Sequence, residues 1–434
     1  MISLAEARAL IQASIRPLAA QSVALAGAHG RVLREDLRAN EDMPAFDRSA
    51  MDGYAVALDD GSKQFRVVGE IQPGVAPAFK INHSEAARIF TGAQIPEGAS
   101  QVIMQEDVRV EGNLITPTQR NRTPHIRKRG EDARKGDLLL KSGARLGAGE
   151  LALLASLGLV EPKVSPLVRV VHFTTGNELV APSDAPKPGQ IRDSNSALIT
   201  ALVDTYGGEI AQQERVADDF DLLLQRAADS LSAEPTRKEN ESSAGWKPPA
   251  RIDLLLVSGG ASVGDYDFGK KLLGALGFQI HFEKINLRPG KPLIFATRGN
   301  QAAFILPGNP VSHFVTFHVA VRLALEKIVA QASSLCVPDA NAETHRLEAC
   351  ATMNLPLAKI RLAEKVEYRP DPRETFWPAR VTIENGGLVA RALRWQSSGD
   401  VNALAGANAL LQFTGATQTL AAGSDVNALL LDVP

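Results

Sequence analysis

Apolar positions between residues 166 and 330 follow two patterns that alternate along the chain. Short uninterrupted apolar runs predict strands, and apolar positions three and four residues apart predict helices. Strands and helices that alternate in this way are typical of a parallel sheet with helices on both faces. We therefore predict a doubly wound α/β domain. Its expected strands are 168–173, 209–216, 252–257, 278–282, 292–295 and 304–306, and its expected helices are 194–206, 220–230, 268–276 and 311–329.

The chain on either side of this domain has different patterns. Near the N-terminus, Ser3 and Glu6 form a capping box before a segment with helical spacing, and a second helix is expected at 150–157. Between these helices the chain consists of short strand patterns separated by Gly and Pro turns. The last hundred residues return to strand patterns, with a hairpin turn expected at Asn385-Gly386-Gly387. The expected domains are residues 1–45 packed with 141–165, an inserted β domain at 46–140, the α/β domain at 166–330 and a C-terminal β domain at 331–434.

Composition limits the classes of partner. The chain has 434 residues, 44% of them apolar, and a net charge of −2, so no global field attracts nucleic acid or membranes. No apolar run reaches the roughly 18 residues that a membrane helix needs, and the first residues do not have the pattern of a secretory signal. Cys336 and Cys350 form neither a disulfide framework nor a zinc pattern. We expect a cytoplasmic protein that binds neither nucleic acid nor membrane, with a polar surface insertion at 232–250.

Polar residues gather where the strands of the α/β domain end. They lie at 174–178, 218–219, 258–267 and 306–310. In open α/β sheets, ligands bind at the carboxyl ends of the strands. This convergence predicts a ligand site at one edge of the sheet.

The stretch from Ser258 to Asp267 is the most specific of these loops. A buried strand ends there in a Gly/Ser loop before a helix, an arrangement whose free N–H groups suit an anion. The alternative is a tight turn with solvated acids. Carboxylates beside a phosphate repel it unless a cation lies between them, so a phosphorylated ligand with Mg²⁺ fits the pattern. The loop residues that we expect to contact such a ligand are Ser258, Gly259, Gly260, Ser262 and Gly264.

Three carboxylates from three strand ends could hold that Mg²⁺ through oxygen ligands: Glu178, Asp219 and Asp267. Asp219 has a second interpretation as the cap of a helix, which is the commoner role for such a residue. The histidines His313 and His318 lie five residues apart on one predicted helix, a poor spacing for a metal, and we expect them to be structural.

Two further segments suit an anion. Prolines fix the turn between Arg288 and Lys291, so these two cations are aimed in advance; a solubilising turn is the alternative. Pro307, Gly308, Asn309 and Pro310 open the long helix, whose N-terminus is an anion site as well as an ordinary capped helix start.

The segment Pro44–Val56 mixes specific polar groups, Asp52 among them, with aromatic residues in a loop-like context. Such loops often carry function, although a linker between domains is the alternative interpretation.

These motifs together resemble the molybdopterin molybdenumtransferase (MoeA-type) family, which includes the E domain of gephyrin. They occur in family order and extend over nearly the whole chain. The matching segments are Pro44–Val56, Thr91–Ala93, Ile103–Asp107, Arg129–Asp132, Thr175–Leu179, Ile191–Asn195, Ser258–Asp267, Arg288–Pro292 and Leu306–Ser312.

The resemblance implies four domains in an elongated homodimer. The first domain would be the dimerisation domain, the third would be similar to molybdopterin adenylyltransferases, and the fourth would be a small β-barrel. The implied activity takes molybdate and adenylyl-molybdopterin as substrates, inserts molybdenum into the dithiolene and releases AMP, with Mg²⁺ required. Molybdopterin adenylyltransferase and proteins of molybdoenzyme maturation are implied as partners.

The resemblance also implies roles for individual residues. Asp52 and Thr91 of one chain would face the third domain of the other, so that the active site lies between subunits. The implied catalytic residues are Asp52, Thr91, Glu178, Asp219 and Asp267. Arg288, Lys291, Pro307 and Pro310 would line the pterin-phosphate and nucleotide region, and the loop Gln396–Gly399, with Ser397 and Ser398, would reach the cleft.

Three positions depart from the family pattern. Asn177 stands where an acidic residue is usual, which leaves the number of metal ligands open. Arg288 replaces a common lysine and changes the donor geometry. The 232–250 insertion is not a usual family feature.

Two other functions remain as alternatives: a molybdopterin adenylyltransferase that uses ATP, and a non-catalytic molybdopterin-binding scaffold. The sequence does not distinguish molybdate from tungstate, because the two anions differ little in size and charge.

Overall fold

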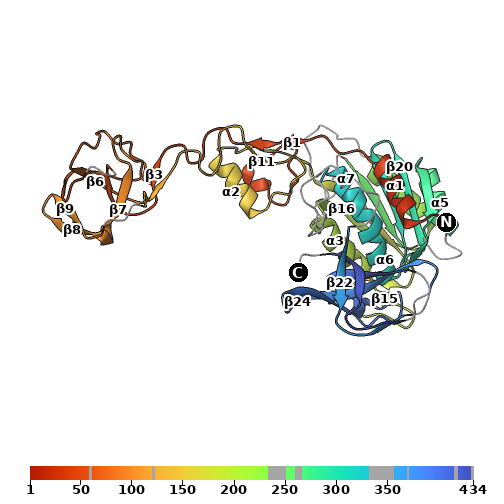
Figure 1. Ribbon diagram of the computed structural model, residues 1–434. Coiled ribbons are helices and arrows are strands. Elements are labelled where there is room, and N and C mark those ends of the chain that lie inside the picture. The colour runs from red at the N-terminus through yellow and green to blue at the C-terminus, as the bar shows by residue number, and fades with distance from the viewer. Residues whose placement is uncertain are drawn as a thin grey trace.

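The computed structural model describes residues 1–57, 61–119, 123–232, 251–259, 266–331, 356–368, 371–414 and 419–431, but not the side chains of Tyr266 and Asp267. The chain is elongated. A small β domain lies at one end, a short middle domain follows, and the α/β domain lies at the other end with a β-barrel beside it (Figure 1). The predicted insertion at 232–250, apart from Ser232, and the two cysteines lie outside the described residues.

The α/β domain is built on a six-stranded sheet with the order β16-β13-β17-β21-β20-β18. Four strands are parallel, as predicted: β16 (Gly208–Val216), β13 (Val168–Thr175), β17 (Leu254–Ser258) and β21 (Gln301–Leu306). The strand β20 (Pro292–Arg298) is antiparallel to both β21 and β18 (Gln279–Lys284). Only two residues, Gly299 and Asn300, join β20 to β21, and so short a connection can only join antiparallel strands.

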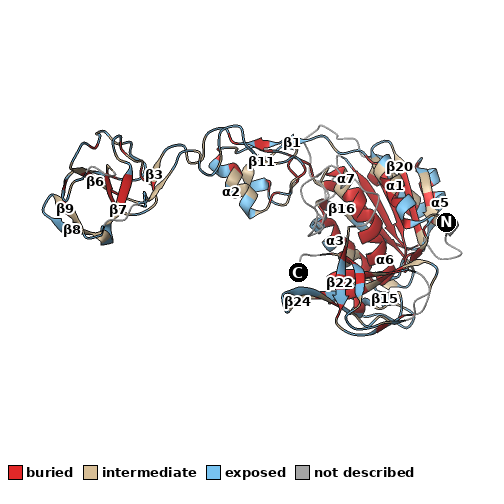
Figure 2. Cartoon of the chain, in the orientation of Figure 1, coloured by how far each residue is buried: buried red, intermediate tan, exposed pale blue. Residues whose placement is uncertain are grey.

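Helices cover both faces of this sheet, which confirms the doubly wound prediction. Along β17, Leu254 and Leu256 face one core and Leu255 and Val257 face the other. The first core contains α1 (Leu4–Ser14), α3 (Asn195–Thr205), α6 (Pro310–Thr316) and α7 (Arg322–Ile328), and the second contains α4 (Phe220–Ser232) and α5 (Tyr266–Ala275). A π-helical turn at Phe317–Val321 joins α6 to α7 in one helical run. Buried residues concentrate in this domain (Figure 2).

The N-terminal helix α1 packs on the α/β domain. Its capping box is present as predicted, with Ser3 and Glu6 bonded to each other. We expected residues 1–45 to pack with 141–165, but Leu4, Ala7 and Ile11 are buried in the same core as α7. The apolar stripe of α1 therefore finds its partner in the long helical run.

The middle domain is assembled from two separate segments of chain, around a core that contains Leu33, Leu154 and Val164. Residues between 21 and 38 meet residues between 138 and 164 there, as expected for the rest of the predicted N-terminal unit. Its elements are β1 (Gln21–Ser22), the 3₁₀ turn Leu25–Gly27, β2 (Leu37–Arg38), β11 (Leu138–Leu140), α2 (Ala148–Ser156) and β12 (Lys163–Val164).

The β domain is inserted between β2 and β11, and its six-stranded sheet has the order β7-β4-β6-β5-β9-β8. The strands are β4 (Gly53–Val56), β5 (Phe65–Ile71), β6 (Glu85–Ile89), β7 (Gln101–Met104), β8 (Val108–Glu111) and β9 (Leu114–Pro117). The 3₁₀ turn Gln105–Asp107 follows β7.

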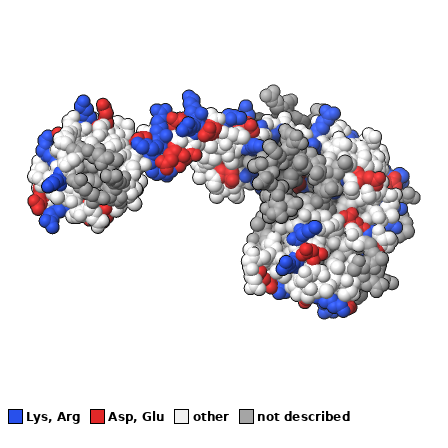
Figure 3. Space-filling model, viewed as in Figure 1, with Lys and Arg blue, Asp and Glu red and all other residues white. Residues whose placement is uncertain are grey.

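Two chain segments lead to and from the β domain and form a neck, closed by β3 (Arg48–Ser49) against β10 (Ile126–Arg127). Charged residues of both signs gather there (Figure 3). Across the neck, Arg129 pairs with Asp42 at 2.7 Å and Lys128 pairs with Asp47 at 2.8 Å. These basic residues are thus neutralised by acids of the facing segment.

The C-terminal domain contains a closed barrel of the strands β24-β25-β22-β28-β26, in which β26 pairs back with β24. The strands are β22 (Leu357–Leu362), β24 (Glu374–Glu384), β25 (Gly387–Ala392), β26 (Ala409–Phe413) and β28 (Asp425–Leu430), with β23 (Val366–Glu367), β27 (Thr419–Leu420) and the 3₁₀ turn Val401–Ala403 beside them. The predicted hairpin turn is confirmed, because Asn385 and Gly386 join β24 to β25 with φ of 50° and 78°. The strand β19 (Leu287–Arg288), which belongs to the α/β segment, adds to the barrel beside β24.

Within the described ranges, no helix combines the length and apolar character needed to cross a membrane.

Gly53, the first residue of β4, allows a very close approach of β7. A Cβ at this position would lie 2.0 Å from the carbonyl oxygen of Ile103. We expect Gly53→Ala to lower the free energy of unfolding by ~1–3 kcal/mol, because β4 and β7 must separate to admit the methyl group. Thermal unfolding measures this, with Gly149→Ala in α2 as the control, since a Cβ there meets nothing within 4 Å. An unchanged melting temperature for Gly53→Ala would contradict the close approach.

Candidate active site

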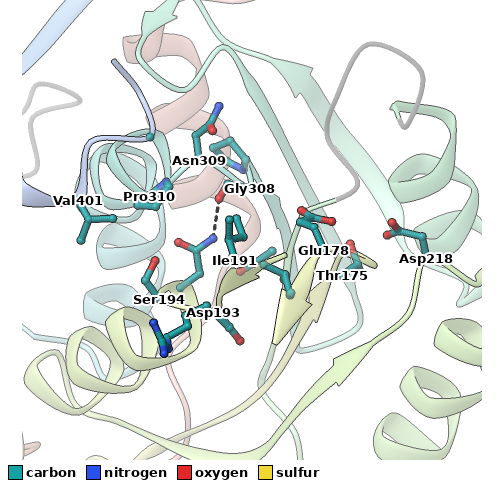
Figure 4. A pocket seen from close by; sticks show the side chains of 18 of the residues that line it. Thr175, Glu178, Ile191, Asp193, Ser194, Asp218, Gly308, Asn309, Pro310 and Val401 are labelled. Carbon is teal, nitrogen blue, oxygen red and sulfur yellow. Dashed lines mark hydrogen bonds between the residues drawn. The ribbon is translucent and has the colours of Figure 1, made fainter. Parts of the chain in front are cut away.

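A cavity of about 800 Å³ opens where β13, β16, β17 and β21 end. This is the edge of the sheet at which the sequence predicts a ligand site, and we refer to it as the strand-end cavity. In Figure 4, Thr175, Glu178 and Asp218 lie on one side of it, and Pro310 and Val401 lie on the other. Its lining residues are Thr175, Gly176, Glu178, Leu179, Ile191–Asn195, Asp218, Ser258, Gly259, Pro292, Pro307–Pro310, Gly399 and Val401.

The turn after β13 positions Glu178. Gly176 has a φ of 150°, which other residues rarely adopt, and a Cβ there would lie 2.7 Å from Oε2 of Glu178, so a side chain at this position would displace the carboxylate. Asn177 and Asp218 then lock the turn to the end of β16. The Asn177 N–H donates to Asp218 Oδ2 at 3.2 Å, and the Asp218 N–H donates to Asn177 Oδ1 at 3.1 Å. Asn177, which departs from the family pattern, therefore holds the turn after β13 against the end of β16.

Asp193 and Asn195 form the floor of the cavity. The buried carboxylate of Asp193 accepts bonds from the hydroxyl of Thr174 at 3.1 Å and from the hydroxyl of Ser196 at 2.5 Å. The amide of Asn195 donates to the carbonyl oxygen of Gly308 at 2.7 Å, which fixes the Pro307–Pro310 loop (Figure 4).

Two buried polar atoms of the strand-end cavity have no partner among the described residues: the hydroxyl of Thr175 and the side-chain oxygen of Asn195. Both residues are more than nine-tenths buried. A buried polar atom without a partner costs ~1–3 kcal/mol, which a bound ligand would offset. We did not single out Asn195 for the site from the sequence, although it ends one of the matching motifs.

Ser258 and Gly259 lie at the cavity, as predicted. The hydroxyl of Ser258, however, is bonded to His172 Nε2 at 2.6 Å. Burial lowers the pKa of both His172 and His313 to about 3, so both rings are neutral at ordinary pH. The predicted loop residues Gly260, Ser262 and Gly264 lie outside the described residues.

A second cavity of about 540 Å³ adjoins the first and carries positive charge. We call it the cationic cavity. Pro292 lines both cavities, and the loop 397–401 contributes Ser397 and Ser398 to one and Gly399 and Val401 to the other. The lining residues of the cationic cavity are Arg288–Pro292, Ser312, Glu367, Tyr368, Arg373, Trp377 and Trp395–Ser398.

The cations of this cavity are held in different ways. Arg373 Nε and Nη2 donate to the two carboxylate oxygens of Asp371 at 2.7 and 2.6 Å, and Arg288 Nη1 lies 3.4 Å from the same carboxylate. The bond from Arg373 lowers the pKa of Asp371 to about 2, so the pair stays ionised. Lys291 forms no ion pair within the part of the chain that the structure describes. Arg288, Lys291, Ser397 and Ser398 were expected in the site, whereas Arg373 and the two tryptophans had no recognisable signal in the sequence.

Comparisons with known proteins agree along the whole chain. Residues 2–158 match the MoeA N-terminal region (domain I and II), residues 172–327 match a probable molybdopterin binding domain, and residues 359–431 match the MoeA C-terminal region (domain IV). Molybdopterin molybdenumtransferases of Nostoc sp. and Bacillus subtilis are 33% and 31% identical to the chain. They cover 95% and 94% of it, and the chain covers 88% and 89% of them.

The chain belongs to the molybdopterin molybdenumtransferase family. A crystal structure of the molybdopterin biosynthesis moeA protein from Pyrococcus horikoshii OT3 has the same architecture, with a TM-score of 0.73 and 27% identity over 99% of this chain and 100% of that one.

Asp52 and Thr91, which were expected to belong to the site, are bonded to each other in the β domain. Both the backbone N–H and the hydroxyl of Thr91 donate to Asp52 Oδ1 at 2.7 Å, and these bonds lower the pKa of Asp52. The β domain lies at the opposite end of the chain from both cavities (Figure 1). A single chain therefore does not bring Asp52 and Thr91 to the strand-end cavity.

The predicted metal set of Glu178, Asp219 and Asp267 needs a correction at Asp219. Glu178 lines the cavity, whereas Oδ1 of Asp219 accepts from the N–H of Leu222 at 3.0 Å and caps α4. The neighbouring Asp218 lines the cavity instead. Asp267 lies in the first turn of α5, and its side chain is not among those that the structure describes. Among the described side chains, no group of three His, Cys, Asp or Glu could hold a metal ion.

The two neighbouring aspartates are expected to differ in their effects. Asp219→Ala should lower the free energy of unfolding by ~1 kcal/mol through loss of the cap, whereas Asp219→Asn should retain it. Asp218→Ala removes the acceptor of the Asn177 N–H together with a carboxylate of the cavity, and it should weaken binding of AMP in the presence of Mg²⁺. Denaturant unfolding and calorimetric titration measure the two effects. Equal loss of AMP binding in Asp219→Asn would contradict this assignment.

Proposed function

We propose that the protein transfers molybdenum to molybdopterin, as the names of its relatives suggest. The family resemblance adds that molybdate supplies the molybdenum and that adenylyl-molybdopterin accepts it with release of AMP. The observation that carries the proposal is the contact between the two cavities at Pro292 and the loop 397–401. One cavity offers carboxylates and unpartnered oxygen groups, and the other offers cations. A substrate with a nucleotide at one end and an oxyanion acceptor at the other would extend across both.

The strand-end cavity suits the adenylyl group. The unpartnered groups of Thr175 and Asn195 would meet polar atoms of the nucleotide, and the apolar side chains of Leu179, Ile191 and Val401 at the cavity wall would contact the base. Loops at the carboxyl ends of parallel strands are the usual place for such a ligand.

The cationic cavity suits molybdate. Arg288, Lys291 and Arg373 surround it, and the hydroxyls of Ser312, Ser397 and Ser398 add neutral donors. Hydrogen bonds to a charged group contribute ~1.5–3 kcal/mol each, so a small dianion would be held by several such bonds.

The donors of the strand-end cavity also fit Mg²⁺. Glu178 and Asp218 supply carboxylates and Thr175 an unpartnered hydroxyl. Mg²⁺ is usually bound through one or two carboxylates together with substrate phosphates, so three protein acids are not needed. Asp267 is proposed as a further ligand on the family resemblance. When bound, Mg²⁺ would offset the phosphate charge and polarise the bond that releases AMP.

We further propose a homodimer in the cytoplasm in which the β domain of one chain completes the site of the other. The support is the exposed Asp52–Thr91 pair, which is ordered by two hydrogen bonds yet lies far from the cavities of its own chain. An enzyme that adenylylates molybdopterin must supply the substrate, which makes it the expected functional partner.

The function is tested by incubating the protein with adenylyl-molybdopterin, Mg²⁺ and molybdate, and in parallel with tungstate. We expect AMP release that depends on the oxyanion. AMP release that does not depend on the oxyanion would contradict the proposal. Adenylylation of molybdopterin by ATP would favour the adenylyltransferase alternative. Binding of adenylyl-molybdopterin without turnover would favour a scaffold.

Within this assay, Lys291→Ala should raise the molybdate concentration needed for half-maximal AMP release about tenfold or more, because it removes a charge-assisted bond to the oxyanion. Lys359→Ala on β22, an exposed lysine outside both cavities, changes net charge equally and serves as the control. A shift of equal size in both variants would point to a general electrostatic effect and would refute the specific role of Lys291.

The dimeric site is tested by complementation. Asp52→Ala and Asp267→Ala chains should each be inactive alone. A mixed dimer keeps one of its two sites intact, and random pairing of equal amounts makes about half of the dimers mixed, so the pool should recover up to about a quarter of the parental AMP release. If dimers that are shown to be mixed release no AMP, a site shared between subunits would be refuted.

A further inference from the structure

The cationic cavity has an aromatic wall that the charges do not explain. Trp377 and Trp395 both line it, with their ring centroids 5.2 Å apart and their planes at 85°. Tyr368 continues the wall and stacks on Phe413 at 4.5 Å. Three aromatic side chains therefore lie beside three cations in one cavity.

The indole of Trp377 is fixed by the barrel. Its N–H donates to the carbonyl oxygen of Leu393 at 2.7 Å, and its ring packs against the barrel core and the edge of Phe413. Such a ring has little freedom and forms a rigid support for its neighbour.

Trp395 is held differently. Its N–H donates to the carbonyl oxygen of Ser397 at 2.6 Å, which closes a short turn just before the loop shared by the two cavities. The ring packs edge to face on Trp377 and is half-buried, and it belongs to none of the apolar cores formed by the described residues. Half-buried indoles outside a core are common where a protein binds a partner, because they offer a large apolar face at a low cost in conformational entropy.

The chemistry of the neighbouring groups limits the class of ligand that could face Trp395. On the proposed function, Arg288 and Lys291 bind the oxyanion, so the ring that faces Trp395 should lie close to an anionic group. On the proposed function, the atoms that accept molybdenum must lie beside the bound oxyanion, because reacting groups have to be placed within contact distance. The pterin portion of the substrate carries those atoms, whereas adenine belongs to the other end of the molecule.

We propose that Trp395, supported by Trp377, stacks on the pterin ring of the substrate and selects for a fused planar ring in the cationic cavity. This rests on the proposed function for the identity of the ring. The stacking face supplies ring recognition, and the cations supply recognition of the oxyanion beside the ring.

The proposal is tested by indole fluorescence in a Trp246→Phe background. The chain has three tryptophans, and this change leaves Trp377 and Trp395 as the only emitters. A 6-substituted pterin monophosphate is titrated, with AMP and inorganic phosphate as comparison ligands. We expect saturable quenching by the pterin phosphate at lower concentrations than by AMP.

Two substitutions separate the ring of Trp395 from its N–H. Trp395→Leu, measured through Trp377 emission and by calorimetry, should weaken the pterin phosphate about tenfold, which corresponds to ~1.4 kcal/mol for one lost stack. Trp395→Phe keeps a ring but loses the bond to Ser397, and should bind within about threefold of the parent. Inorganic phosphate should bind equally to all three. Ile383→Ala, at an exposed position on the β24–β25 hairpin, is the control for barrel substitutions.

Three outcomes would overturn the proposal. The first is that the parent fails to bind the pterin phosphate, and the second is that Trp395→Leu binds it as tightly as the parent. The third is that Trp395→Leu and Trp395→Phe lose affinity for the pterin phosphate equally and lose binding of inorganic phosphate as well. That third outcome would mean that Trp395 acts only through the Ser397 turn. Molybdate-dependent AMP release from the same samples keeps the two hypotheses apart. Normal release with no effect of Trp395→Leu would refute the stacking role alone, and no release from the parent would refute the proposed function.

Discussion

A single backbone hydrogen bond joins the two halves of the site. The N–H of Val311, in the first turn of α6, donates to the carbonyl oxygen of Ser398 at 2.9 Å. The first N–H groups of a helix have no partner within the helix, so this loop of the barrel satisfies one that the α/β domain cannot. The bond joins the loop 397–401, which lines both cavities, to the helix that follows Pro307–Pro310. The pairing of β19 with β24 supports it from the other side of the interface.

Periodicity and strand-end position predicted much of this architecture. The four parallel strands, the helices on both faces, the β24–β25 hairpin and the cavity residues Glu178, Ser258 and Gly259 all follow from local patterns. They could be predicted because the carboxyl ends of parallel strands must meet at one edge. The family resemblance supplied what local patterns lack, namely the C-terminal β-barrel. The hydrogen bonds between Asp52 and Thr91 were not predicted.

The remainder depended on tertiary contacts. The pattern of α1 fits any apolar partner, and only packing decides that it joins α7. Asp218 and Asp219 are adjacent and chemically equal, and the start of α4 decides which one becomes the cap. Arg373, Trp377 and Trp395 reach the site because the barrel folds back on the α/β domain, and no spacing rule connects them with Lys291, more than eighty residues earlier.

The neck between the middle and β domains has a consequence for how far the β domain can travel. Its ion pairs, Asp42 with Arg129 and Asp47 with Lys128, are largely exposed, and exposed pairs contribute only ~0.2–1 kcal/mol each. Each pair is therefore comparable in strength to thermal energy and is weakened further by salt. The two segments of the neck run antiparallel and are closed by the pairing of β3 with β10. A bend of the neck would carry the β domain and the Asp52 carboxylate with it, so we expect the reach of this carboxylate to depend on ionic strength.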